Sequence, residues 1–288
     1  MAKYSKTATE FRNIPLATVT GVVLFLLLFA CLFITPYLFL GLVFIACIIA
    51  VGEVYYCLKI KNIRIGLPPI IIGSAGMILV SFYYGSGGLS VVYFLTVAVL
   101  ILYCSLDHID YKAKIQQVSY SVLICTWIPF LASFLILTYC LPFGAYKLAL
   151  SSVIISFIDL GGLVIGSHFG KHALAPQLSP KKTWEGFAGG LVFGIVTILL
   201  SSAGFEFMNI YFLQTSVFSL KGVLDRLLFA LCACIFGLIG DLAESSLKRF
   251  AKVKDMSTLL AGHGGIMDRI DSTLIFTPVL YLLFLFLG

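Results

Sequence analysis

The sequence predicts an all-α polytopic membrane protein with about nine transmembrane helices and a cytoplasmic N-terminus. Hydrophobic residues make up 60% of its 288 positions and charged residues only 11%, whereas soluble domains are close to half apolar and about a quarter charged. Apolar stretches of about 17 to 25 residues recur along the chain, and each could cross a hydrocarbon core as a helix. No extramembrane domain of ordinary size fits between them.

Helix breakers separate most of the predicted spans. The spans are residues 16–35, 37–58, 67–84, 89–106, 118–141, 146–168, 187–205, 222–243 and 271–287. Pro36, the GSGG stretch at 85–88 and Pro142 lie between spans, as expected of helix breakers. Pro129 lies inside the fifth span and predicts a kink there. The first apolar stretch is long and leads into a second, so we interpret it as a retained helix and not as a signal peptide.

The basic residues indicate the orientation of the chain. With the N-terminus inside, 16 of the 19 Lys and Arg residues fall in cytoplasmic segments, which is the bias that membrane proteins show. The long polar segments 168–186 and 244–270 then face the cytoplasm. We divide the chain into N-terminal transmembrane helices, 1–140, and a C-terminal catalytic region, 141–288, that carries both cytoplasmic loops.

The polar stretch from Ser245 to Asp271 is the strongest candidate for chemistry. It holds five Lys or Arg residues and three Asp residues around an HGG triplet, in a chain that has few charges. Acidic residues can bind a divalent cation, basic residues can bind phosphates, and glycine lets the backbone approach an anion closely. The composition of this stretch therefore predicts a metal and phosphate site.

Carboxylates at the ends of the last two spans are the predicted metal ligands. Asp241 closes the eighth span, while Asp268 and Asp271 are three residues apart and lie on one face of a helix that opens the ninth. Mg²⁺ takes one or two carboxylates and completes its shell with water and phosphate oxygens. We predict Asp241 and Asp268 as ligands and Asp271 as a further candidate. The alternative is a set of helix caps and salt bridges.

Two other acids within predicted spans are open to both structural and functional interpretations. Asp159 lies within the sixth span, where a carboxylate is costly unless it is paired or binds an ion. Glu53 lies near the cytoplasmic end of the second span, and we expect it to reach the interface or to pair with Lys59. No role is assigned to Glu185.

A fixed order of residues runs through the polar stretch: a Ser, a Lys-Arg pair, a Lys-Asp pair and HGG-x-x-DR-x-D. These residues are Ser245, Lys248, Arg249, Lys254, Asp255, His263, Gly264, Gly265, Asp268, Arg269 and Asp271. The pattern resembles the signature of the phosphatidate cytidylyltransferases, also called CDP-diacylglycerol synthases. The SPKKTWEG stretch, 179–186, resembles a second loop of that family. The resemblance covers residues 155–287, although Ala261 stands where the family commonly has Pro.

The resemblance implies a nucleotidyl transfer. A phosphate oxygen of phosphatidate attacks the α-phosphorus of CTP, pyrophosphate leaves, and CDP-diacylglycerol stays in the bilayer for phospholipid biosynthesis. Catalysis would consist of positioning and charge neutralisation by Mg²⁺, Lys and Arg. The predicted catalytic residues are Asp241, Asp268, Lys248 and Arg249. The predicted substrate-binding residues are Ser179, Lys181, Lys182, Thr183, Lys254, His263, Gly264, Gly265 and Arg269.

The same interpretation predicts the cofactor, the binding partners and the cellular location of the protein. Mg²⁺ is the expected cofactor, and a second cation is left open. CTP, phosphatidate and the lipid bilayer are the expected partners, without nucleic acid, and a homodimer is left open. We expect a multi-pass protein of the inner, cytoplasmic membrane whose active site faces the cytoplasm. The alternatives are a related membrane enzyme with another lipid phosphate acceptor and a multi-span transporter, which is disfavoured because the charge gathers at one face.

Overall fold

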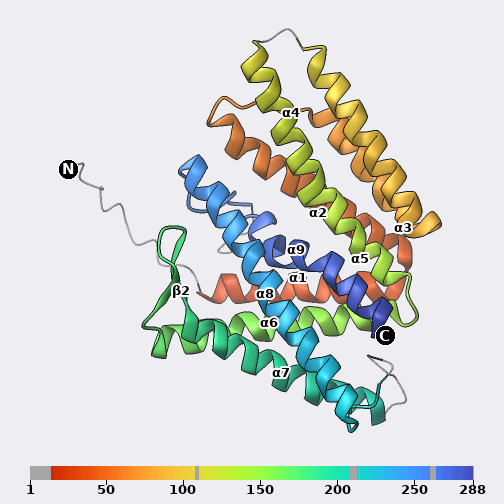
Figure 1. Cartoon of the computed structure of the whole chain (residues 1–288), viewed down its shortest axis with the longest axis vertical. Helices are drawn as coiled ribbons and strands as arrows, with labels where there is room; N and C mark the ends of the chain where they lie inside the picture. Colours follow the sequence, from red (N-terminus) through yellow and green to blue (C-terminus); the bar gives the residue numbers. More distant parts are fainter. Residues whose placement is uncertain (1–13, 108–109, 208–212, 214, 260–263, 288) are drawn as a thin grey trace.

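Helices form nearly all of the computed structural model, which describes residues 14–107, 110–207, 213, 215–259 and 264–287 (Figure 1). In chain order the elements are α1 (Ile14–Ile34), α2 (Pro36–Lys59), α3 (Leu67–Ser105), α4 (Tyr111–Cys125), the π-helical turn η1 (Thr126–Phe130), α5 (Leu131–Tyr139), α6 (Gly144–Phe169), β1 (Ala173–Ala175), β2 (Ser179–Thr183), α7 (Trp184–Phe207), α8 (Leu220–Ala251) and α9 (Met267–Phe286). Within the described residues, seven helical segments are long and apolar enough to cross a membrane, and α1 adds a shorter apolar helix. The predicted polytopic helical fold is confirmed. The count of nine crossings and the cytoplasmic N-terminus stay predictions.

The long element α3 reverses direction at Gly85. This glycine has φ 66° and ψ −155°, a conformation that residues with a Cβ rarely adopt. A Cβ on Gly76 would lie 3.2 Å from the Val92 side chain, and one on Gly73 would lie 2.7 Å from the hydroxyl of Thr96. The two arms therefore run antiparallel in close contact, and they correspond to the predicted spans 67–84 and 89–106.

Pro129 interrupts the helix where a kink is predicted. It lies in η1, which joins α4 to α5 in one helical segment from Tyr111 to Tyr139. Proline lacks an N–H and crowds the preceding turn, so a local π-helical turn accommodates it. The hydroxyl of Ser133 donates to the Pro129 carbonyl at 2.7 Å and satisfies that acceptor.

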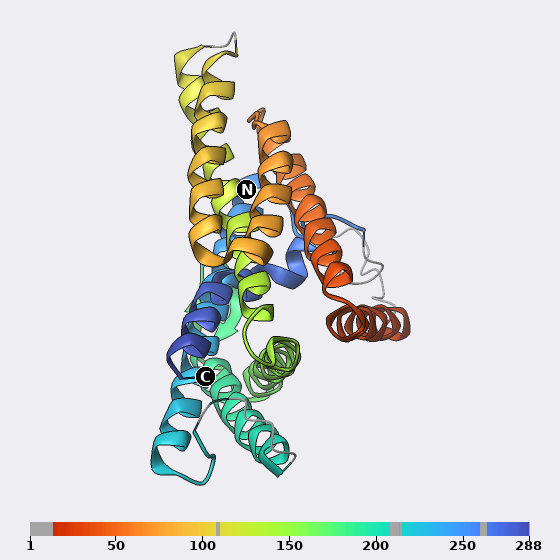
Figure 2. The ribbon, with the colours of Figure 1, turned by 90° about the vertical axis from the view of Figure 1, so that its right-hand side faces the viewer.

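Helices α6 and α7 pack along each other, and α8 crosses to reach α9 (Figures 1 and 2). Glycines make the close approach of α6 and α7 possible, as small residues do between membrane helices. A Cβ on Gly186 would lie 2.9 Å from the Gly162 carbonyl, and one on Gly190 would lie 2.9 Å from the Ile158 carbonyl. This packing places Asp159 of α6 beside the start of α7. In the other half of the chain, α2 and α5 contact α9.

The predicted cytoplasmic loop 168–186 contains a small antiparallel hairpin of β1 and β2, with Ala173 opposite Thr183. Hydrogen bonds to Glu185 hold the base of this hairpin in place. Its Oε2 accepts from the backbone N–H groups of Lys171 and His172 at 3.1 and 3.2 Å, and its Oε1 lies 2.6 Å from Nδ1 of His172. The hairpin departs from a purely helical prediction, and its anchoring gives Glu185 a structural role.

The predicted loop 244–270 is wrong at its start, because α8 continues as a helix to Ala251. No helix breaker follows Gly240 until that point, and the Glu244–Lys248 pair at i,i+4 supports the additional turns. The helix ends where Lys252 adopts a left-handed conformation with φ 61°. Asp241, Lys248 and Arg249 are therefore held on a rigid helix.

Candidate active site

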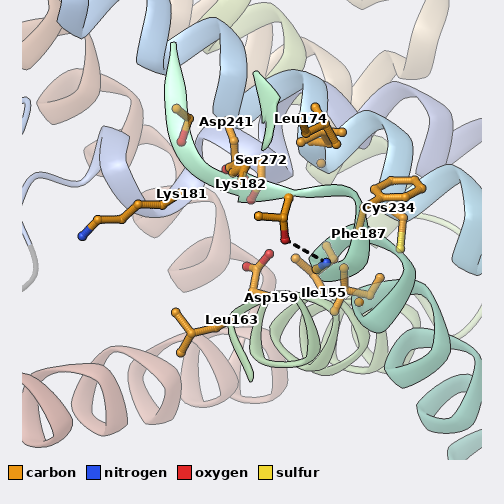
Figure 3. Close-up of a pocket in the computed structure, with 18 of the residues that line it drawn as sticks. Ile155, Asp159, Leu163, Leu174, Lys181, Lys182, Phe187, Cys234, Asp241 and Ser272 are labelled. Atoms are coloured by element: carbon orange, nitrogen blue, oxygen red, sulfur yellow. Dashed lines mark hydrogen bonds and ion pairs between the residues drawn. The ribbon is translucent and has the colours of Figure 1, made fainter. Parts of the chain in front are cut away.

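A cavity of about 400 Å³ lies among α6, α7, α8 and the hairpin (Figure 3). Its polar lining residues are Asp159, Ser179, Lys181, Lys182, Thr183, Asp241 and Ser272. Figure 3 shows Asp159, Lys182 and Asp241 around the same space, whereas the ammonium of Lys181 points away from them. The cavity is large enough for a small-molecule ligand. Residues of the predicted polar segment 168–186 meet Asp241 of α8 and Ser272 of α9 in it.

An ion pair between Lys182 and Asp241 joins the two sides of the cavity. Lys182 Nζ contacts Asp241 Oδ2, and their side chains are 27% and 30% exposed. Asp159 lies within electrostatic range of both groups and of Arg269. Opposite charges nearby stabilise a carboxylate on an apolar helix, so the three side chains form one charged group.

A second, more deeply buried group surrounds Asp268 at the start of α9. Lys248 Nζ pairs with Glu244 Oε2 and with Asp268 Oδ1, and the side chains of these acids are 3% and 6% exposed. Asp268 Oδ2 accepts from the backbone N–H of Gly265 at 2.6 Å and from that of Met256 at 3.1 Å. Both oxygens of Asp268 are thus held, which fixes the orientation of its carboxylate.

Glu244 has no role in the sequence interpretation, yet it lies at the centre of this group. Its carboxylate approaches those of Asp268 and Asp271, and its buried Oε1 receives no hydrogen bond from the described residues. The signal that could have found it is its spacing, three residues after Asp241 and four before Lys248, which places all three on one helical face. That signal was hidden because the helix was predicted to end at 243.

The carboxylates of α8 and α9 suit a hard cation. Gly240 lets α8 touch α9, since a Cβ on it would lie 2.8 Å from Ser272 Cα. Asp271 then lies within electrostatic range of Asp241 and Glu244, and Glu244 within range of Asp268. Neighbouring carboxylates repel unless a proton or cation lies between them, and oxygen donors favour Mg²⁺. Across the described ranges, no three His, Cys, Asp or Glu side chains converge as a ready metal site. Asp241 and Asp268 are each paired with a lysine. The donor set fits a cation that uses only one or two protein carboxylates.

The remaining predicted residues divide into those beside the cavity and those away from it. Ser179, Lys182 and Thr183 line it, and Thr183 also caps α7 by accepting from Gly186 N at 3.1 Å. Arg249 lies outside the lining and donates from Nε to the Leu178 carbonyl at 3.2 Å, which ties the hairpin to α8. Lys254 is exposed outside the cavity lining.

The glycines of the HGG triplet lie against the carboxylate of Asp268. Gly264 has φ 80°, and a Cβ there would lie 2.7 Å from Asp268 Oδ2. Gly265 donates to the same oxygen. His263 lies outside the described residues. The triplet therefore shapes the loop that holds Asp268.

A second cavity of about 420 Å³ borders the first. Side chains of α1, α2, α5, α6 and α9 line it, most of them apolar, such as Leu28 and Phe39. Arg269 lies in its wall, and Ile155, Asp159 and Ser272 belong to both cavities. Apolar side chains make up most of both linings, but Lys182 and Asp241 line only the first, which we call the polar cavity; the second we call the apolar cavity. The two cavities share a wall that carries one acid, Asp159.

Comparisons with known proteins show the family of the chain. The model of the cytidylyltransferase family matches residues 16–287. Over 277 residues the chain is 31% identical to the phosphatidate cytidylyltransferase of Mycobacterium leprae, covering 91% of this chain and 85% of the relative. It is 30% identical to that of Mycobacterium tuberculosis H37Rv, covering 94% and 82%, and 40% identical to that of Bacillus subtilis over 143 residues, covering 49% and 48%. The predicted family is confirmed, and the chain belongs to the cytidylyltransferase family.

Proposed function

We propose that this protein transfers CMP from CTP to phosphatidate, giving CDP-diacylglycerol and pyrophosphate. The observation that carries the proposal is the wall shared by the two cavities. Both cavities are lined mostly by apolar side chains, but lysines and Asp241 line only the first, and Asp159 and Ser272 belong to both. A reaction between a water-soluble nucleotide and a membrane lipid needs such a meeting point. The relatives are named as phosphatidate cytidylyltransferases.

The polar cavity is the proposed nucleotide site. Ser179, Lys182 and Thr183 face it from the hairpin, and ammonium and hydroxyl groups donate hydrogen bonds to phosphate oxygens. The ammonium of Lys182, which pairs with Asp241 in this structure, is the group of this cavity that we expect to contact a triphosphate. No nucleophilic side chain is needed, because the phosphate of the lipid acceptor is already ionised.

We assign Mg²⁺ to Asp241 and Asp268, with Asp271 as a third candidate ligand. Bound Mg²⁺ would stabilise the negative charge on the phosphates. Lys248 and the loop N–H groups hold Asp268 in one orientation. A fixed carboxylate can bind or release a cation without a rearrangement of the helices, which is the preorganisation that charge-stabilising sites require.

The apolar cavity is the proposed site of the lipid. Its lining from α1, α2 and α6 suits acyl chains, and Arg269 gives its wall one cation that could meet a lipid phosphate. We place the protein in the lipid bilayer of the inner membrane, with the polar cavity toward the cytoplasm. Association as a homodimer stays a prediction.

The test is an assay of the purified protein in detergent micelles with CTP, phosphatidate and Mg²⁺. We expect CDP-diacylglycerol and pyrophosphate in equal amounts, and no product when a chelator removes the metal. Pyrophosphate release with a different lipid phosphate, but not with phosphatidate, would assign another acceptor. If no lipid phosphate in a panel supports pyrophosphate release, the proposal fails.

A further inference from the structure

Glu53 is a buried acid in the half of the chain that carries none of the predicted site residues. It lies on α2, its residue is only 5% exposed, and a carboxylate inside an apolar helix is costly unless it has partners. The expected pairing with Lys59 is wrong, because the Lys59 ammonium lies over the ring of Tyr55, 5.9 Å from its centroid. The partners of Glu53 lie instead more than 200 residues away along the chain.

The carboxylate of Glu53 accepts three hydrogen bonds from the loop that leads into α9. Oε1 accepts from the Ser257 hydroxyl at 2.6 Å and from the Ile266 N–H at 3.0 Å, and Oε2 accepts from the Met267 N–H at 2.8 Å. The first N–H groups of a helix have no partner within the helix and attract negative charge. No side chain at the N-cap position of α9 supplies that partner. Glu53 therefore caps α9 from another helix.

A second residue of α2 holds the opposite end of the same loop. Cys57, one helical turn after Glu53, places its Sγ 3.4 Å from the Sδ of Met256. The backbone N–H of Met256 donates to Asp268 Oδ2, as does that of Gly265. The contacts from α2 thus flank both backbone groups that orient the Asp268 carboxylate.

Glu53 packs so closely against Gly265 that no larger residue fits at this position. A Cβ on Gly265 would lie 2.5 Å from each carboxylate oxygen of Glu53, whereas the backbone of Gly265 does not have a positive φ. The requirement for glycine here comes from the acid packed against it. At Gly264 the positive φ is itself a reason for glycine. The two glycines of the triplet are therefore needed for different reasons.

We infer that Glu53 is a positioning residue of the active site. It fixes the segment 265–267, and this segment holds Oδ2 of Asp268 so that Oδ1 faces Lys248. Glu53 does not line either cavity of the proposed site. The inference rests on the proposed function for its effect on turnover, but the contact itself can be tested without any substrate.

The first test measures the loop directly, by hydrogen exchange of the full-length protein in detergent. Ile266 and Met267 donate to different oxygens of Glu53, and Glu53→Gln keeps only one of them. At least one of the two amides should therefore exchange on the order of tenfold faster, as expected when roughly one hydrogen bond is lost. Glu206→Gln is the matched control, because Glu206 also accepts a backbone N–H, that of Val217 at 2.9 Å, at the opposite end of α7. Unchanged exchange in Glu53→Gln would overturn the inference.

The second test separates positioning from binding. Glu53→Gln should lower kcat on the order of 100-fold, since small displacements of a reacting group have effects of this size, while the KM for CTP stays within about threefold. Ser257→Ala removes one of the three hydrogen bonds to Glu53 and should lower kcat by a smaller factor. This variant keeps the test available if Glu53→Gln fails to fold. A rise in KM with kcat unchanged would contradict positioning. A wild-type protein without transferase activity would refute the proposed function but leave the exchange result valid.

The third test uses the contact between Glu53 and Gly265. Gly265→Ala should inactivate the enzyme by displacing Glu53, and the shorter side chain of Glu53→Asp should make room for the added methyl group. In the double variant the two losses should not add, as expected for residues in direct contact. Additive losses would show that Gly265 is required for a reason other than Glu53.

Discussion

Lys182 and Asp241 form an ion pair although they are 59 residues apart in the sequence. The pair connects β2, which belongs to the first polar segment, with α8, which leads into the second. The first polar segment and the end of the eighth predicted span therefore build one charged surface. Positive charge from one and negative charge from the other meet at the cavity, which suits a metal–nucleotide complex better than either charge would alone.

Asp241→Asn should abolish CMP transfer while the protein still folds. The amide keeps the shape of the side chain but loses the charge that would bind Mg²⁺ and that balances Lys182. The measurement is the rate of pyrophosphate release, with size-exclusion chromatography to confirm folding. Asp110→Asn is the control, because Asp110 is an exposed acid at the start of α4. Near-normal turnover in Asp241→Asn would remove this residue from the metal site.

Mg²⁺ should raise the thermal stability of the wild-type protein in detergent. A ligand at 100 times its Kd stabilises the folded state by about 2.7 kcal/mol. Asp268→Asn should lose this response because one predicted ligand is missing, and Ca²⁺ or Mn²⁺ can be compared in the same thermal scan. An equal Mg²⁺ response in the wild type, Asp241→Asn and Asp268→Asn would place the cation elsewhere.

Lys248→Met should destabilise the protein by about 3 to 5 kcal/mol, because removing one partner leaves a buried charge without compensation. Adding Glu244→Gln removes one of the two buried acids and should recover part of the loss. Denaturation in mixed micelles measures both effects. Lys252→Met, at the exposed end of α8, should change stability by less than about 0.5 kcal/mol. Equal stability of Lys248→Met and Lys252→Met would refute the buried ion-pair group.

Gly264→Ala should destabilise the loop by about 1 to 2 kcal/mol through its left-handed backbone and should reduce turnover, because its Cβ would meet Asp268 Oδ2. Gly87→Ala is a suitable control, since a Cβ at that position meets no atom within 4 Å. Thermal unfolding and turnover are measured for both variants. A Gly264→Ala enzyme with full activity would show that the orientation of Asp268 tolerates this change.

Ala46→Phe should interfere with the lipid and not with the nucleotide, because Ala46 lines the apolar cavity. A loss of about 1.4 kcal/mol in lipid binding corresponds to a tenfold higher KM, so we expect about this change for long-chain phosphatidate and little change for CTP. Ala243→Phe fills a different cavity beside α4 and α8 and serves as the control. Equal effects of the two variants would argue against a lipid site here.

Much of the fold could be predicted because membrane-spanning helices have a distinctive apolar composition. Long apolar runs, the proline in the fifth span and the glycines between spans are local signals, and each corresponds to a helix or a break in the structure. The extension of α8 to Ala251 was missed because its last turns are polar. Polar residues can belong to a helix as well as to a loop, and only the i,i+4 pairing of Glu244 with Lys248 indicates which.

The candidate site could be predicted only as far as its signature residues. Asp241, Asp268 and Lys248 stand out as charges in an apolar chain, but their pairings depend on how distant helices cross. Glu53 could not be connected with Met267 from sequence, because hydrogen bonds across 214 residues leave no local pattern. Gly265 was recognised as part of the signature, but the need for glycine at this position comes from the side chain of Glu53 on another helix.

The wall between the two cavities also has a consequence for the order of events. Ile155, Asp159 and Ser272 face both sides of it, so a product with a nucleotide head and lipid tails would have to straddle this boundary. Pyrophosphate can leave through the polar side alone, whereas the larger product must draw its head across the boundary into the bilayer. The side chains of this shared wall would then affect exit of the lipid product as well as bond formation.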